Sequence, residues 1–217
     1  MTEPSNFHFW MDWGVQAIVG VGTLMVAAVA IFADAIKAKF VKLTVAIDSS
    51  RGTYQPFMRV LRNGGQVVAL TSGSIPAQHY QLRVSNSSRY FPSHRTMLWL
   101  LKLDRKYGDD LKTDWRGEIP LTWQHEDFLP GPRVIGKHSV LADLVCLSSE
   151  GIVAIQVRNP PIAFPQEIKG ACELWLTVQA RSDESSSNEY RVHIKWDGVW
   201  DAESNRTKAE LSIRDLS

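Results

Sequence analysis

The sequence predicts an all-β sandwich of immunoglobulin-like type, preceded by one N-terminal transmembrane α-helix. A long uncharged run lies near the N-terminus, a two-residue periodicity begins at Lys42, and turn-forming residues separate the short apolar runs that follow. Such short, regularly spaced strands are typical of sandwiches and barrels. The predicted parts are a short extracytoplasmic N-terminus (1–12), a transmembrane helix (13–35), a basic juxtamembrane segment (36–41) and a β-sandwich domain (42–217).

Composition limits the classes of protein that this chain can belong to. In 217 residues, Lys and Arg number 24 and Asp and Glu number 23, which leaves a formal charge of +1. A neutral balance argues against a strongly basic nucleic-acid binder, and no nucleic-acid polymer is expected as a partner. The chain has 2 cysteines, which exclude a disulfide-rich scaffold and a four-cysteine zinc site.

The transmembrane prediction depends on the uncharged run between Asp12 and Asp34. At about 1.5 Å per residue a helix over this run reaches about 30 Å, the hydrocarbon thickness of a bilayer. A cleaved signal peptide is the main alternative, because Ala33-Asp34-Ala35 resembles a cleavage site. A signal peptide has a positive start, however, and residues 1–12 contain no Lys or Arg. The expected membrane-interface anchors are Trp10, Trp13, Lys37 and Lys39.

The flanking charges predict the orientation. Lys37, Lys39 and Lys42 follow the run, and no Lys or Arg precedes it. The positive-inside rule therefore places the C-terminal domain in the cytosol, on a single pass through a bacterial inner membrane. The lipid bilayer is the first expected partner.

Small residues within the run lie on one helical stripe, which lets two helices approach closely in lipid. The chain itself is thus a second possible partner, as a homo-oligomer. Small residues are also common in such helices without any association, and the sequence leaves both readings open. The predicted helix-association seam is Ala17, Gly20, Thr23, Ala27 and Ala30.

Strand signals cover most of the chain after Lys42. We expect residues 96–103 to pair back onto 79–86 through the turn at 86–89, and Asp197-Gly198 to form a hairpin turn. A Gly64-Gly65 turn would join 57–61 to 66–70. The other predicted strands are 42–47, 119–123, 140–147, 152–157, 173–180, 190–196 and 209–213.

The predicted strands indicate which aromatic residues and cysteines are buried in the core. Trp99, Trp123 and Trp175 are the candidates for core aromatics. Cys146 and Cys172 are expected as buried thiols in a reducing cytosol, and a disulfide between them becomes plausible if the orientation is reversed.

No sequence signature supports an enzyme, a cofactor or a metal site. No two histidines stand three or four residues apart, and His125-Glu126-Asp127 lacks the second histidine of a zinc-protease helix. Basic and aromatic residues do gather around 83–106, where they could receive a nucleotide or another small anion. The alternative is an ordinary solvated face. The residues of this possible anion patch are Arg83, Arg89, Arg95 and Lys102.

Three segments carry a resemblance to a known group: Tyr80–Asn86, Pro120–Trp123 and Trp196–Asp201. With the N-terminal run they resemble an uncharacterised bacterial family of short single-pass membrane proteins with a β-sandwich body. The resemblance covers about Trp10 to Leu216 and implies a fold more than a function. It implies no catalytic residues.

Three functions remain open from the sequence. The first is a membrane-tethered, non-enzymatic interaction or sensor module that binds an unidentified cytosolic protein. The second is a ligand-gated membrane-disrupting effector; its architecture is similar to effectors of bacterial antiviral defence, in which a nucleotide binds the soluble part. The third is a periplasm-facing envelope protein with a Cys146–Cys172 disulfide.

Overall fold

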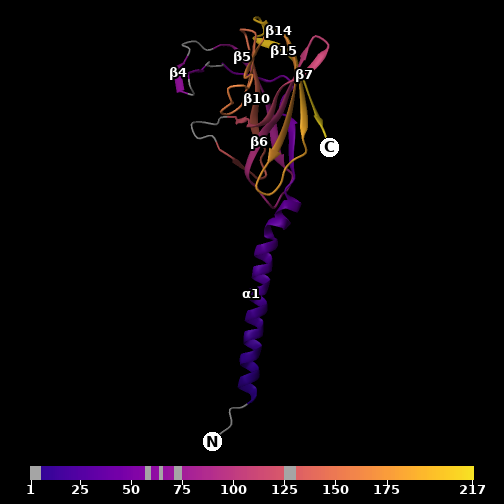
Figure 1. Ribbon diagram of the computed structural model, residues 1–217. Coiled ribbons are helices and arrows are strands. Elements are labelled where there is room, and N and C mark those ends of the chain that lie inside the picture. The colour runs from indigo at the N-terminus through magenta and orange to yellow at the C-terminus, as the bar shows by residue number, and fades with distance from the viewer. Residues whose placement is uncertain (1–5, 57–59, 64–65, 71–74, 125–130) are drawn as a thin grey trace. The chain divides into compact units, whose positions relative to one another are not determined.

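The structure is a computed structural model and describes residues 6–56, 60–63, 66–70, 75–124 and 131–217. The side chains of residues 6–12, 30, 31, 34, 36, 60–63 and 66–70 lie outside this description. The chain divides into two compact units, Met1–Phe40 and Val41–Ser217, and each is considered by itself (Figure 1).

The first unit contains one helix, α1 (Asn6–Phe40), which begins before and ends after the predicted 13–35. Among the described residues, no helix is both long enough and apolar enough to cross a membrane. The prediction of a helix is thus confirmed with wider bounds, while membrane crossing is not supported.

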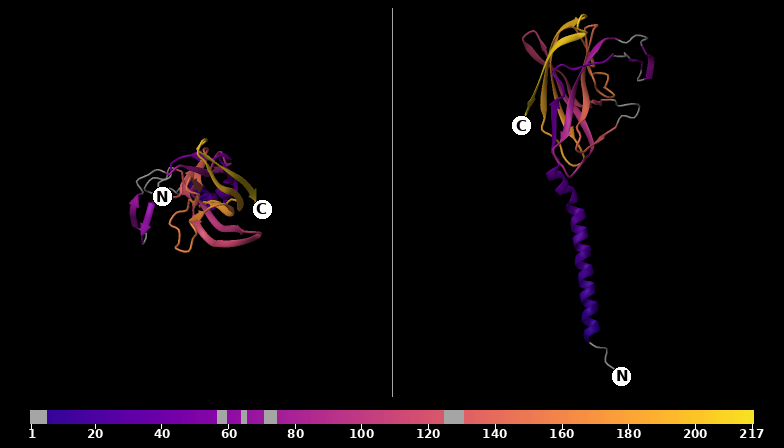
Figure 2. Two further views of the ribbon diagram at one scale, coloured as in Figure 1. Left: turned by 90° about the horizontal axis from the view of Figure 1, so that it is seen from above. Right: turned by 180° about the vertical axis from the view of Figure 1, so that it is seen from behind.

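The second unit is a β-sandwich of two packed antiparallel sheets, which confirms the predicted sandwich (Figures 1 and 2). The first sheet has seven strands in the order β1-β5-β10-β11-β12, with β2 beside β5 and β8 beside β10. Their bounds are β1 (Leu43–Ile47), β2 (Thr53–Tyr54), β5 (Ala77–Asn86), β8 (Thr122–Trp123), β10 (Val140–Ser148), β11 (Ile152–Ile155) and β12 (Glu167–Lys169).

The second sheet has six strands in the order β15-β14-β13-β6-β7, with β9 beside β6. A separate pair, β3 and β4, realises the predicted glycine hairpin, although Gly64, Gly65 and 57–59 lie outside the described residues. The bounds are β3 (Val60–Asn63), β4 (Gln66–Leu70), β6 (Ser93–Tyr107), β7 (Asp110–Pro120), β9 (Arg133–Ile135), β13 (Cys172–Arg181), β14 (Tyr190–Asp201) and β15 (Arg206–Asp215).

The core lies between the two sheets and is built by alternate residues of their central strands. In β5 the side chains of Tyr80, Leu82 and Val84 are buried, and in β13 those of Leu174 and Leu176 are buried. Residues two apart point to the same face of a strand, so this pattern fills the space between the sheets. At about 25 cal/mol per Å² of apolar surface, burial of these branched side chains is the main stabilising contribution.

The expected hairpin between 79–86 and 96–103 is wrong. β5 pairs with β1 and β10, whereas β6 pairs with β13 and β7 in the other sheet. The polar residues after Asn86 therefore form a connection between sheets. The amide of Asn86 organises it by donating to the carbonyls of Phe91 and Ile135, at 2.8 and 3.2 Å.

The expected turn at Asp197-Gly198 is also wrong. β14 continues to Asp201, and its register with β15 shifts between Trp196 and Trp200. Gly198 occupies this bulge with a φ of 80°, a left-handed conformation that glycine adopts without the steric cost of a Cβ. The chain turns later, where the carboxylate of Asp201 accepts from the backbone amides of Glu203 and Ser204 at 3.0 and 3.3 Å.

The expected core aromatics have different fates. Trp123 is fully buried, whereas Trp99 and Trp175 are only partly buried. Trp196 is buried, and its indole donates to the hydroxyl of Thr207. Cys146 and Cys172 are free, buried thiols.

Candidate functional site

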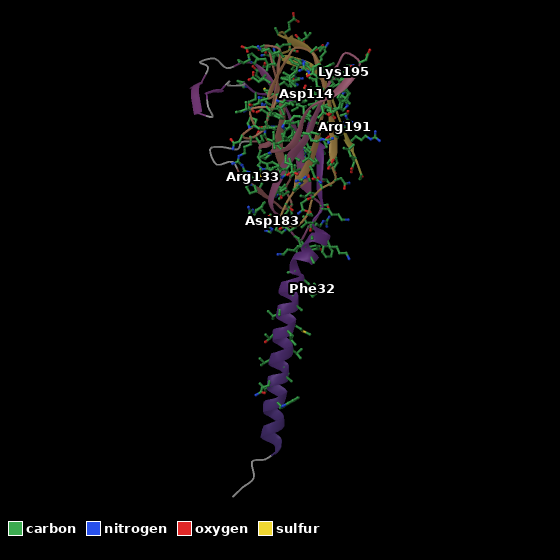
Figure 3. All side chains as sticks on the ribbon, viewed as in Figure 1. Phe32, Asp114, Arg133, Asp183, Arg191 and Lys195 are labelled. Carbon is green, nitrogen blue, oxygen red and sulfur yellow. The ribbon has the colours of Figure 1, made fainter. Side chains whose placement is uncertain are left out.

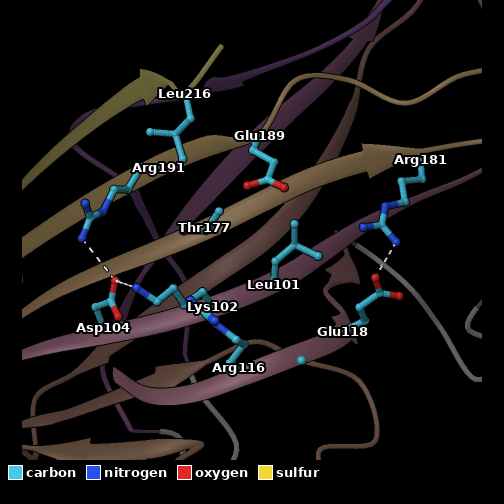
Figure 4. A pocket seen from close by; sticks show the side chains of 11 residues that line it. Leu101, Lys102, Asp104, Arg116, Glu118, Thr177, Arg181, Glu189, Arg191 and Leu216 are labelled. Atoms are coloured by element: carbon cyan, nitrogen blue, oxygen red, sulfur yellow. Dashed lines mark hydrogen bonds and ion pairs between the residues drawn. The ribbon is translucent and has the colours of Figure 1, made fainter. Parts of the chain in front are cut away.

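An open groove of about 550 Å³ lies on the outer face of the second sheet (Figure 4). Strands β6, β7, β13 and β14 supply most of its lining, and Leu216 comes from the C-terminal segment after β15. The groove is rich in charge of both signs. Its lining is Leu101, Lys102, Asp104, Arg116, Gly117, Glu118, Thr177, Arg181, Glu189, Arg191 and Leu216.

A bulge in β6 explains why the groove begins there. Leu100 pairs with Val178 and Lys102 pairs with Thr177, so Leu101 is one extra residue on β6. One extra residue reverses which face the following side chains take. Leu98 and Leu100 before the bulge and Leu103 after it therefore all reach the core, while Lys102 and Asp104 face outward. The predicted strand 96–103 thus lies within β6 and changes phase at the bulge.

Asp104 is the centre of the groove's hydrogen bonds. Its carboxylate accepts from the Lys102 ammonium at 2.8 Å, the Thr113 hydroxyl at 2.7 Å and the Arg191 guanidinium at 3.1 Å. The side chain is only 3% exposed. Burial would raise the pKa of Asp104, but the hydrogen bonds from Lys102 and Thr113 and the positive charges of Lys102 and Arg191 hold that pKa below its usual value.

A row of side chains continues from this carboxylate along the outer face. Arg191 lies over the Trp175 ring at 5.8 Å, and Trp175 stacks on the His193 ring with centroids 4.6 Å apart. His193 Nε2 lies 2.9 Å from Glu173 Oε1, and the Lys106 ammonium lies 3.5 Å from the same carboxylate. The partly buried tryptophan is therefore held between a cation and an imidazole. It packs on the outer face and not in the core.

The groove lining also contains a second ion pair and charged side chains without an ion-pair partner among the described residues. Arg181 donates to Glu118 at 2.8 Å, as Figure 4 shows. Among the side chains that the structure describes, neither Arg116 nor Glu189 has an ion-pair partner. The Nε atom of Arg191 is buried with no hydrogen-bond partner in the described part of the chain. The groove thus keeps donors and an acceptor that a bound polar group can use.

The structure does not gather the predicted anion patch into one site. Only Lys102 lies in the groove. Arg83 forms an ion pair with Asp48 on the first sheet, and Arg95 lies 3.9 Å from Asp183. Arg89 lines a separate small pocket. Anion binding by these four residues as a group has no geometric support, and anion binding by any one of them stays a prediction.

The predicted helix residues lie along α1, where their roles stay predictions. The side chains of Ala17, Thr23 and Ala27 are exposed, and a Cβ at Gly20 would meet no atom within 4 Å. Trp13 is exposed and the carbonyl of Val19 accepts from the hydroxyl of Thr23 at 2.8 Å.

The remaining members of the predicted helix set are described less completely. Lys39 is exposed and Lys37 is partly exposed in the last turn. The side chains of Trp10 and Ala30 lie outside the described residues.

A thiol and an imidazole are in contact within the first sheet. Cys146 Sγ lies 3.6 Å from His79 Nε2 between β10 and β5. Burial, with a smaller contribution from the charge of Asp143, raises the pKa of Cys146 to about 12, and burial lowers the pKa of His79. This pair therefore does not form a thiolate at neutral pH. Within the described residues no three His, Cys, Asp or Glu side chains are placed to hold a metal ion. The segment His125-Glu126-Asp127, which lacks the second histidine of a zinc signature, lies outside them.

No family model, curated protein or solved structure matches the chain. Of the expectations that came from the resemblance of the three segments, the structure supports the sandwich of two antiparallel sheets. Those segments lie at Tyr80 in the core, at the β7–β8 junction and at the β14 bulge.

The groove itself was not predicted. Asp104, Arg191 and Glu118 come from three strands whose neighbours are decided by the sheet order, which periodicity does not specify. The available signal was the Leu-Leu-Lys-Leu-Asp segment, in which two adjacent apolar residues break the alternation at the bulge.

Proposed function

We propose that the chain is a non-enzymatic interaction module that α1 holds at a lipid bilayer and whose outer groove is the binding face. The surface of α1 carries the first part of the proposal. Every described side chain from 13 to 29 is exposed, and these include Ile18 at 74%, Leu24 at 72% and Val26 at 71%. A helix that is apolar on all sides is stable only when it is buried in protein or in lipid.

The polar groups of the same segment suit a lipid environment. A hydroxyl without a partner in hydrocarbon costs several kcal/mol, on the order of 2–7. The Thr23 hydroxyl avoids this cost because it donates to the Val19 carbonyl one turn earlier, at 2.8 Å. Gln16 is the other clearly polar side chain of the run and lies near its start, where the headgroup region is within reach.

The finer form of the proposal is a single crossing of a bacterial inner membrane, with an immunoglobulin-like sandwich in the cytosol. The segment that would cross is the uncharged run between Asp12 and Asp34, which reaches about 30 Å as a helix. The positive residues after Asp34 are the support for a cytosolic sandwich.

The groove supports the interaction part of the proposal. Its charges are mostly committed to each other, through Asp104 and through the Arg181–Glu118 pair, so it suits a partner surface with polar groups of both signs. We expect such a partner to place an acidic group against Arg116 and a basic group against Glu189. A partner protein without these charges would bind the groove more weakly.

Fractionation of cells that express the full chain tests the bilayer part. We expect the chain in the membrane pellet, resistant to high salt and alkaline carbonate, and released by detergent. Leu24→Lys together with Val26→Lys should move it to the supernatant, because each charge in hydrocarbon costs about 2.5–3.5 kcal/mol. Val199→Lys, at an exposed apolar position on β14, is the matched control and should not change the distribution. A wild-type chain that stays in the supernatant refutes the proposal.

A partner screen tests the groove. Purified full chain in mild detergent should capture a cytosolic protein, and the capture should weaken by about tenfold in the Arg116→Ala variant. Lys195→Ala, which removes an exposed cation on β14 outside the groove lining, is the control. Equal capture by both variants would place the interaction elsewhere.

The second candidate is a ligand-gated, membrane-disrupting effector, and the buried Arg191 Nε in the groove favours it. A small anion bound beside Arg116 and Arg191 would drive α1 copies together through the seam. This function predicts growth inhibition on overexpression that Gly20→Leu or Ala27→Leu abolishes. Unimpaired growth would refute it. The envelope alternative predicts a mobility shift on reduction, through a bridge between two thiols that the structure has as free.

A further inference from the structure

A second, smaller pocket of about 370 Å³ lies on the second unit, away from the groove. Its lining is entirely polar or cationic: Asn86, Ser87, Ser88, Arg89 and Lys137. No carboxylate contributes to it. The two cations and the hydroxyl of Ser88 are donors that a phosphate group prefers, while the hydroxyl of Ser87 donates to the carbonyl of Lys42 at 3.4 Å.

Asn86 fixes the shape of this pocket. Its amide nitrogen donates to the carbonyls of Phe91 and Ile135, at 2.8 and 3.2 Å, which ties the segment after β5 to the end of β9. Its amide oxygen accepts from the backbone nitrogen of Ser88 at 3.0 Å. The two cations therefore come from two segments that one side chain holds together, and little ordering is needed when a ligand binds.

The cations of this pocket differ from those of the groove in their partners. In the groove, Lys102 and Arg191 share Asp104. Among the side chains that the structure describes, Arg89 and Lys137 have no ion-pair partner, and both are exposed. An anion that enters the small pocket gains two charge-assisted contacts without displacing an internal carboxylate.

The pocket lies at the end of the sandwich where β1 begins. The Ser87 backbone nitrogen donates to the Lys42 carbonyl at 3.0 Å, and Lys42 comes two residues after Phe40, the last residue of α1. Figure 3 shows Arg133 and Asp183 toward this end of the sandwich and Asp114 and Lys195 toward the other. Only Phe40 and Val41 lie between Lys39 and Lys42, so the Cα atoms of these two lysines lie within about 11 Å of each other whatever the direction of α1.

We propose that the pocket of Asn86, Ser87, Ser88, Arg89 and Lys137 binds a phosphate group, and that in the bilayer-held chain this is the phosphate of an anionic phospholipid. The choice of a lipid source rests on the proposed function, because α1 then places Lys39 at the headgroups. The phosphate chemistry rests on the lining of the pocket alone. A free phosphate compound has the same chemistry, and the experiment below separates the two sources.

Amide hydrogen exchange of the full chain tests the proposal, with the backbone amides of 86–92 as the readout. The chain is reconstituted in phosphatidylcholine vesicles, and in the same vesicles with about one third phosphatidylglycerol. A third sample is the chain in neutral detergent with about 20 mM inorganic phosphate, against chloride at equal ionic strength. We expect exchange in 86–92 to slow with phosphatidylglycerol and with inorganic phosphate.

Variants show whether the two cations are responsible. Arg89→Ala and Lys137→Ala should each reduce the slowing by about fivefold, the factor that corresponds to about 1 kcal/mol for one basic residue near an anionic surface. Arg89→Lys should retain most of the effect. Arg206→Ala, at an exposed arginine that begins β15 in the second sheet, is the matched control and should behave as wild type.

Each outcome decides one part of the proposal. If phosphatidylglycerol slows amide exchange in 86–92, and Arg89→Ala and Lys137→Ala lose this slowing, the lipid source is supported. Slowing by inorganic phosphate alone supports the pocket and overturns the lipid source. Equal exchange in all samples, or slowing that survives the loss of both cations, overturns the pocket. A chain that fails to associate with either vesicle refutes the proposed function, and the inorganic phosphate sample still decides the pocket.

Discussion

Replacement of Asp104 by asparagine is the most direct test of the groove's electrostatics. The change keeps the shape of the side chain and removes the charge that Lys102 and Arg191 share. Removal of one partner from a buried ion pair costs about 3–5 kcal/mol when the other partner stays buried. Here the Lys102 and Arg191 side chains are 29% and 35% exposed, so both can turn toward water. We therefore expect Asp104→Asn to lower the free energy of unfolding by about 2–3 kcal/mol.

The pH dependence gives a second, independent readout. The pKa of Asp104 is lowered in the folded chain, so its contribution to stability is fully present above the unfolded value of about 3.9. That contribution is lost as the pH falls from there through the lower folded pKa. The difference in stability between wild type and Asp104→Asn should therefore be constant near neutral pH and shrink below about pH 4.

Urea unfolding of the full chain in mild detergent, followed by tryptophan fluorescence, measures both effects. Asp183→Asn is the matched control, because its carboxylate is 58% exposed and lies 3.9 Å from Arg95. That change should cost less than about 0.5 kcal/mol. A loss at Asp104 no larger than at Asp183, or a loss that persists unchanged below pH 4, would refute the argument that the buried carboxylate organises the groove.

Three further outcomes follow from single positions. Gly198→Ala should destabilise the fold by about 2–3 kcal/mol in the same assay, because φ is 80° and the new Cβ would lie 2.7 Å from a backbone nitrogen. Its control is Gly108→Ala, where φ is 62° and no atom lies near the new Cβ; this change should cost only about 1 kcal/mol. Trp196→Phe should cost about 1–2 kcal/mol through the lost indole hydrogen bond, and a neutral result would contradict the buried bond. At pH 8, iodoacetamide should alkylate Cys146 and Cys172 about a hundredfold more slowly in the folded than in the unfolded chain, because burial raises their pKa values to about 12 and about 11; rapid labelling under native conditions would show that the thiols are accessible.

The sequence predicted strands well because alternation is a local signal. The predicted ranges 79–86, 140–147, 173–180 and 190–196 each fall within an observed strand. Pairing was less predictable, since turn residues do not say which sheet the chain enters next. Asn86 illustrates this: its turn chemistry is real, but the side chain bonds to Ile135, which is distant in sequence.

The candidate site was the least predictable part. Basic residues between 83 and 106 were visible in the sequence, but their side chains point to different faces. The bulge at Leu101 places Lys102 on the outer face of the second sheet, while Arg83 lies on the first sheet. The partners that give Lys102 its environment, Asp104 and Arg191, depend on a strand order that no local pattern encodes.

The extra residue in β6 has a counterpart in the other sheet, where the pairing of β10 with β5 shifts between Asp143 and Val145. A regular strand can slide by two residues and still present apolar side chains to the same side. A strand with an extra residue cannot slide in this way without moving its bulge to a new place on the partner strand. Leu101 and Leu144 thus favour a single alignment of β6 with β13 and of β10 with β5.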